Sequence, residues 1–193
     1  MPLILASSSP RRRELLQAAS IPFISQPADV PEVHTPGELP TQFSERLARE
    51  KARAVWQKLP TNPSNFVLGA DTIVIVDNHI LGKPGSPDDA VRMLRLISGR
   101  THEVTTSVCL IGANSGRTYE DVRSETSRVV VSPISEQEIR DYVGHGEPMD
   151  KAGAYAIQGV AGRWIPRIEG CYFNIVGLPI PLVYRMLKEH GAL

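Results

Sequence analysis

The chain has 193 residues, of which 41% are hydrophobic and 22% charged, and these proportions are ordinary for a globular protein. Its 21 lysines and arginines balance 21 aspartates and glutamates, so the net charge is zero, which argues against a general nucleic-acid-binding protein. Two cysteines, Cys109 and Cys171, form neither a disulfide framework nor a zinc-binding pattern, and we expect reduced thiols in a cytoplasmic protein. We recognise no signal peptide and no apolar run near the length of a membrane span, so no membrane partner is expected.

The first predicted elements suggest an anion site. Leu3–Ala6 is long enough for a buried strand, and Pro10 fits the first turn of a following helix with Ser9 as its N-cap. The first turn carries Arg11–Arg13, although cations at a helix N-terminus are unfavourable by about 0.3–1 kcal/mol each when exposed. A phosphate would compensate, because free backbone N–H groups, serine hydroxyls and guanidinium groups meet there. The alternative is that the arginines point into solvent or pair with Glu14.

A proline-rich segment separates the next two predicted elements. The sequence predicts a short strand over Pro22–Ser25, a loop over Gln26–Pro40 and a helix over Thr41–Lys58. The loop carries spaced carboxylates, Glu32 among them, which suits a lid or a metal-ligand loop, and a solvated connection is the alternative. The helix has a mostly basic polar surface that includes Lys51, and such a surface is usually just solvated.

The strongest strand signal covers Phe66–Val76, where apolar and β-branched residues indicate a strand buried on both sides. Asp71 and Thr72 interrupt it. Because burial of an unpaired carboxylate is costly, Asp71 needs a metal, a cation or hydrogen bonds, and such acids are often catalytic. Gly69 would let a ligand approach the backbone closely. The alternative is an aspartate that caps a break in the strand.

The middle of the chain alternates between strands, turns and helices. Asp77–Asn78 predicts a hairpin turn, and the tight loop Gly82–Gly85 presents Lys83 as a second candidate for phosphate binding. Further predicted elements are a helix opened by Ser86 and ended by Gly99, long strands over Thr101–Ile111 and Arg117–Val131 joined by a turn around Asn114–Gly116, and a helix over Ser135–Val143.

A small, glycine-rich stretch, Met149–Gly159, holds Gln158, whose amide offers both a donor and an acceptor to a nucleobase edge. Packing of small residues against a helix is the alternative. Strand candidates lie at Tyr155–Ile157, Trp164–Ile168 and Gly170–Val176, and Gly177–Pro179 starts the last helix. Helices and strands alternate first and strands cluster later, which favours an α/β fold on a mixed sheet.

Several segments, taken in order, resemble the signature of the Maf family, and the resemblance covers nearly the full chain. The segments are Ser7–Arg12, Gly69–Thr72, Gly82–Pro84, Leu96–Val104, Asp150–Gly159 and Val176–Pro179.

The resemblance implies a single domain over residues 1–193 with two lobes that are not independent domains. The implied fold is an elongated mixed β-sheet flanked by helices, with a deep cleft, related to that of the inosine triphosphate pyrophosphatases. The implied activity is hydrolysis of a nucleoside triphosphate to the monophosphate and pyrophosphate with a divalent cation such as Mg²⁺, Mn²⁺ or Co²⁺. Family members are cytoplasmic, are often homodimers, and are historically linked with septum formation.

The resemblance also assigns substrate and catalytic residues. It makes Asp71 the proton acceptor, and Arg11, Thr72 and Gln158 match the branch that acts on dTTP and UTP. The branch acting on 7-methyl-GTP tends instead to have Gln after that aspartate and Glu before the late glycine.

Further matches concern the charged groups. Lys51 and Lys83 match recurrent lysines of the family. Glu32 matches a recurrent loop acid, although Pro31 replaces the acidic residue often found beside it.

These observations lead to one hypothesis, metal-assisted hydrolysis between the α and β phosphates of dTTP or UTP, with Asp71 as base. Asp71 and Glu32 are the expected metal ligands. The expected phosphate-binding residues are Ser7, Ser8, Arg11, Arg12, Lys51 and Lys83. The alternative is a nucleotide-responsive binding protein that acts in septum formation without turnover. A nucleic-acid module using Arg11–Arg13 would lack an aromatic platform and overall positive charge.

Overall fold

A computed structural model describes residues 3–60, 65–114 and 117–193, and the chain divides into two compact units. The first unit contains Met1–Asp71, Thr106–Glu125 and Gly177–Leu193, and the second contains Thr72–Thr105 and Thr126–Val176. The expectation that they are lobes of one domain stays a prediction. In the described part of the chain, no helix combines the length and apolarity needed to cross a membrane.

The strands form a mixed sheet with the order β2-β1-β3-β5-β6-β7, and β4 pairs with β3. Their bounds are β1 Leu3–Leu5, β2 Phe23–Ser25, β3 Phe66–Val76, β4 His79–Leu81, β5 Thr101–Asn114, β6 Arg117–Val130 and β7 Arg167–Glu169. β1 runs parallel to both β2 and β3, whereas the pairs β3–β4 and β6–β7 are antiparallel. The predicted mixed α/β architecture is therefore confirmed.

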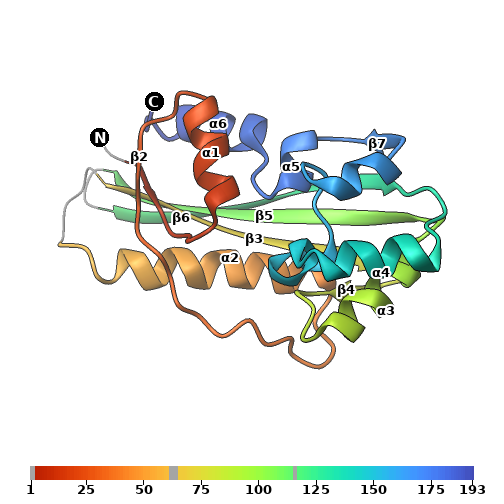
Figure 1. Cartoon of the computed structure of the whole chain (residues 1–193). Helices are drawn as coiled ribbons and strands as arrows, with labels where there is room; N and C mark the ends of the chain where they lie inside the picture. Colours follow the sequence, from red (N-terminus) through yellow and green to blue (C-terminus); the bar gives the residue numbers. More distant parts are fainter. Residues whose placement is uncertain (1–2, 61–64, 115–116) are drawn as a thin grey trace. The chain divides into compact units, whose positions relative to one another are not determined.

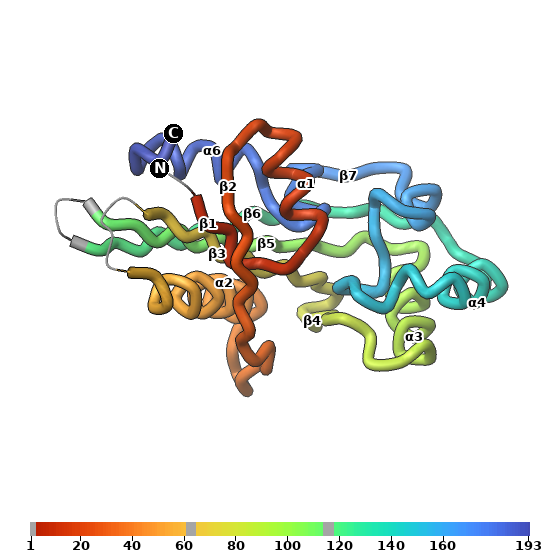
Figure 2. The backbone as a smooth tube through the Cα atoms, turned by 60° about the vertical axis from the view of Figure 1, so that its left-hand side comes forward, coloured from red at the N-terminus to blue at the C-terminus, as the bar shows by residue number. Residues whose placement is uncertain are grey.

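In the first unit, helices cover both faces of the strands. Figures 1 and 2 show α2 (Pro40–Trp56) on one face and α1 (Pro10–Ala18) and α6 (Ile180–Glu189) on the other. The apolar side of α2 packs on the strands because its buried residues recur at helical spacing. The core cluster between them is formed by Ile4, Ala6, Ala48, Ala52, Val55, Val67, Cys109 and Ile111.

Gly69 sets how closely α2 lies against β3. A Cβ atom at this position would lie 2.2 Å from the carbonyl oxygen of Ala48 and 2.7 Å from the amide nitrogen of Ala52. Only a residue without a side chain fits, so glycine lets the helix backbone approach the strand. The expectation that Gly69 makes room for a ligand is wrong, because α2 fills that space.

The second unit has its own apolar core. α3 (Pro87–Ile97) and α4 (Glu136–Gly144) lie side by side, as Figure 1 shows, and each begins at a serine N-cap whose hydroxyl accepts a backbone N–H bond. Short 3₁₀ helices over Glu147–Asp150, Ala152–Ala154 and Val160–Trp164 follow, with α5 over Tyr172–Val176. The largest core side chains include Leu94, Ile97, Ile139, Tyr142 and Trp164.

Three strand predictions in this unit are wrong or shifted. Tyr155–Ile157 forms no strand, because Gly153 and Ala154 have φ of 69° and 60° and turn the chain tightly before it. Trp164–Ile168 contributes only the start of β7, and most of Gly170–Val176 is helical. The predicted turn at 115–116 lies outside the described residues.

Candidate active site

The first unit brings together one lysine and two carboxylates, here called the Lys51 cluster (Lys51, Asp71 and Glu32). The ammonium of Lys51 donates to Asp71 Oδ1 and to Glu32 Oε1, each at 2.6 Å. The side chains of Lys51 and Asp71 are only 10% and 8% exposed, whereas that of Glu32 is 42% exposed. The buried carboxylate predicted to need a partner therefore has a cation, and a second carboxylate shares it.

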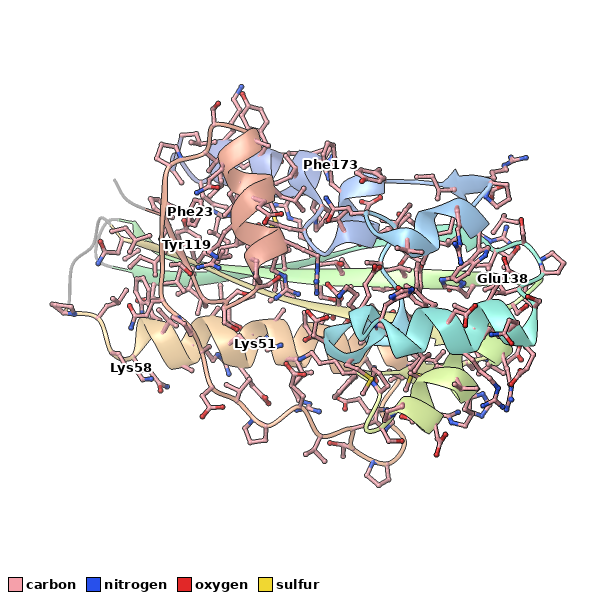
Figure 3. The ribbon with its side chains drawn as sticks, in the orientation of Figure 1. Phe23, Lys51, Lys58, Tyr119, Glu138 and Phe173 are labelled. Carbon is pink, nitrogen blue, oxygen red and sulfur yellow. The ribbon has the colours of Figure 1, made fainter. Side chains whose placement is uncertain are left out.

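Local geometry explains why these groups meet. Successive residues of a strand point to opposite faces, so Asp71 lies on the same face of β3 as Gly69, where α2 packs. On α2, Lys51 stands between Ala48 and Ala52, the two residues closest to Gly69. Figure 3 marks Lys51 on this helix. The close approach at Gly69 therefore delivers the ammonium directly to the carboxylate.

Burial raises the pKa of Asp71 above its usual value, and the positive charges of Lys51 and Arg12 act against this shift. A carboxylate with a raised pKa is a better proton acceptor than an exposed one, and it stays available as a base at neutral pH as long as cations keep it ionised. The role of Asp71 as proton acceptor stays a prediction.

Arg12 is held in the protein interior by three acceptors. Its Nε donates to the carbonyl oxygen of Gly177 at 2.8 Å, and its Nη1 donates to the carbonyl oxygen of Ala70 at 2.9 Å and to Ser7 Oγ at 3.2 Å. Burial lowers the pKa of Arg12, while the negative charge of Asp71 opposes this effect. Arg12 therefore joins the start of α1 to the residue before Asp71 and to the segment before α6.

The remaining residues around α1 differ in exposure. Ser9 is the N-cap, as predicted, and its hydroxyl accepts the amide of Arg12 at 3.5 Å. Ser7 is buried, Ser8 is exposed, and Arg11 is half-buried in the first turn of the helix. Phosphate binding by Ser7, Ser8, Arg11 and Arg12 stays a prediction.

The other predicted site residues belong to the second unit. Thr72 follows Asp71 on β3 and is half-buried, while Lys83 and Gln158 are exposed. The carbonyl oxygen of Gly82, next to Lys83, accepts the amide of Gly153 at 3.0 Å, which ties that loop to the glycine-rich stretch.

Sequence reasoning missed the residue that supports the turn carrying Gln158. The carboxylate of Glu147 accepts the hydroxyl of Tyr142 at 2.9 Å and the amide of Val160 at 3.3 Å. A Cβ atom at Gly159 would lie 1.9 Å from Glu147 Oε1, so the turn packs directly on this carboxylate. A lone glutamate after a loop carries no pattern that would reveal this role.

Comparison with known proteins places this chain in a family. The family described as Maf-like protein matches residues 2–190. A protein of Koribacter versatilis named dTTP/UTP pyrophosphatase is 59% identical over 193 residues, which cover 100% of this chain and 96% of that protein. Proteins with the same name from Syntrophomonas wolfei and Hahella chejuensis are 49% and 48% identical, over 97% and 98% of this chain and 97% and 92% of their own lengths. The chain therefore belongs to the Maf-like protein family.

Proposed function

We propose that this chain is a nucleoside triphosphate pyrophosphatase that hydrolyses dTTP and UTP to the monophosphate and pyrophosphate. The observation that carries the proposal is the buried Asp71, paired with Lys51 and Glu32, in a chain 59% identical along its full length to a protein named dTTP/UTP pyrophosphatase.

In the proposed reaction, a water oxygen forms a bond to the α phosphorus, and the bond from that phosphorus to the oxygen bridging the α and β phosphates breaks. Pyrophosphate leaves with the bridging oxygen. Asp71 takes the proton of the attacking water, which suits a buried carboxylate whose pKa is raised. Lys51 supplies positive charge beside Asp71, which favours a negatively charged substrate.

A divalent cation such as Mg²⁺, Mn²⁺ or Co²⁺ fits the donors that the chain offers. The described residues contain no group of three or more His, Cys, Asp or Glu side chains suited to a metal. Asp71 and Glu32 nevertheless lie close together, because both carboxylates bind the ammonium of Lys51. Mg²⁺ is commonly held by one or two carboxylates together with water and substrate phosphates. When bound, such a cation neutralises phosphate charge and acidifies a water molecule.

The remaining predicted roles concern the substrate. Arg11, Thr72 and Gln158 offer hydrogen-bonding groups that suit the carbonyls and N–H of uracil and thymine. Exposed Lys83 and Ser8 and half-buried Arg11 are accessible to phosphate oxygens. Buried Arg12, fixed to three protein acceptors, contributes mainly through its charge.

The test compares Asp71→Asn with wild type and with Asp141→Asn, a control at an exposed position of α4. Pyrophosphate release is measured from dTTP, UTP, CTP, ATP and GTP with each metal, and nucleotide binding is measured by calorimetry. Loss of a general base predicts a fall in turnover of about 10²–10⁴-fold with binding retained. Near-normal turnover by Asp71→Asn would exclude Asp71 as the base. Nucleotide binding by wild type without turnover of any triphosphate would favour the binding-protein alternative.

A further inference from the structure

The segment that carries Glu32 has little apolar burial beyond its first residues. Residues 26–39, here called the Glu32 loop, contain neither helix nor strand, and Figure 1 shows them running from β2 along the outer side of α2. Val33 and Leu39 are 69% and 62% exposed, whereas Val30 is half-buried and Ala28 packs against the core of the first unit. Apolar packing therefore holds the start of the loop, and polar contacts must hold the part from Glu32 to Leu39.

One arginine of α2 bonds this loop at two points. Arg46 Nε and Nη2 donate to the two carboxylate oxygens of Glu38 at 2.7 and 2.9 Å, a bidentate pair. The same Nη2 donates to the carbonyl oxygen of Val33 at 2.9 Å. Because Val33 directly follows Glu32, this second bond fixes the backbone next to Glu32, one of the two carboxylates of the Lys51 cluster.

Contacts within the loop reinforce this arrangement. Glu38 Oε2 also accepts the amide of Thr35 at 3.3 Å. The backbone carbonyl oxygen of Glu38 lies 2.9 Å from His34 Nε2. Phe43 contacts both the loop and the arginine, with its ring 5.2 Å from the ring of His34 and 5.4 Å from the Arg46 guanidinium carbon. Bonds to Arg46 lower the pKa of Glu38 to about 2, so the pair is charged throughout the neutral range.

We propose that Arg46 is a positioning residue, which fixes the Glu32 loop so that Glu32 reaches Lys51 and Asp71. The inference rests on the proposed function, in which Glu32 takes part in binding the metal and substrate. Two cations of one helix then determine where Glu32 lies: Arg46 through the neighbouring backbone and Lys51 through the carboxylate itself.

The test uses Arg46→Lys, which keeps the charge but loses the planar fork that reaches three acceptors of the loop and also Glu50 of α2. Arg49→Lys is the matched control, because Arg49 lies on the same helix, is 32% exposed against 29% for Arg46, and pairs with Glu120 outside the loop. A glutamate-specific endoproteinase reports on the loop directly through cleavage after Glu32 and Glu38. We expect faster cleavage in Arg46→Lys and no change in Arg49→Lys, with similar melting temperatures for both.

Kinetics then separate positioning from general destabilisation. We expect Arg46→Lys to lower kcat/KM by about tenfold and to raise the Mg²⁺ concentration at half-maximal rate, with no effect of Arg49→Lys. In a Glu32→Gln background the Arg46→Lys effect should largely vanish, because both changes remove the same contribution. An equal effect in both backgrounds, or unchanged cleavage, would overturn the proposal. Absence of turnover in wild type would contradict the proposed function, while the cleavage comparison would still decide whether Arg46 holds the loop.

Discussion

Replacement of Gly69 by alanine should disturb the candidate site without touching any of its chemical groups. The new Cβ would lie 2.2 Å from the carbonyl oxygen of Ala48, and an ordinary contact requires 3.4 Å. Because the obstructing atoms belong to the backbone of α2, the helix must retreat from β3 by about 1.2 Å. Overpacking of this kind costs about 1–3 kcal/mol of unfolding free energy.

The same retreat moves Lys51 away from Asp71, where the ammonium and carboxylate are now 2.6 Å apart. Misplacement by about 1 Å can lower an enzymatic rate by about 10²-fold. We therefore expect Gly69→Ala to lower both the free energy of unfolding in urea, by about 1–3 kcal/mol, and kcat/KM for dTTP, by about 10²-fold.

Gly144→Ala is the matched control, since a Cβ there meets nothing within 4 Å and the residue ends α4. Alanine at this position should leave stability unchanged or raise it slightly, because alanine favours helix more than glycine does. If Gly69→Ala were as stable and as active as Gly144→Ala, the packing argument for the Lys51–Asp71 contact would be refuted.

Two further predictions concern buried polar groups. Arg12→Lys should lower the unfolding free energy by about 3 kcal/mol in urea titrations, because lysine cannot bond all three acceptors; unchanged stability would contradict this expectation. Burial lowers the pKa of His102 to about 4 from 6.5, so its neutral form stabilises the fold fully above pH 6.5, and this contribution falls as pH drops from 6.5 to 4. The loss should reach about 3 kcal/mol by pH 4. His102→Gln should show a shallower decline over that range, and an identical decline would count against the assignment.

The sequence predicts more about Asp71 than about the residues that surround it in the folded protein. A carboxylate within an apolar strand must have a partner, and the structure provides one in Lys51, 20 residues earlier in the chain. Periodicity shows which face of a helix is buried, but it does not show which residue of a distant strand that face meets. Lys51 was thus recognisable only by resemblance, and Arg46 was indistinguishable from an ordinary solvated arginine.

The errors in predicting the fold from the sequence have a similar cause. Gly69 correctly indicated a close backbone approach, but a glycine alone does not distinguish a ligand from a helix. Tyr155–Ile157 were predicted as a strand because the positive φ values of Gly153 and Ala154, just before them, are invisible in the sequence. Long strands and capped helices were predicted well, since their signals are local and repeated over many residues.

The bond from Arg12 to the carbonyl oxygen of Gly177 spans 165 positions of the chain. During synthesis the arginine leaves the ribosome long before its acceptor, which is made 165 residues later. A nascent chain therefore carries this guanidinium without its full set of bonds until Gly177 has been made, and the neighbourhood of Asp71 matures only after that.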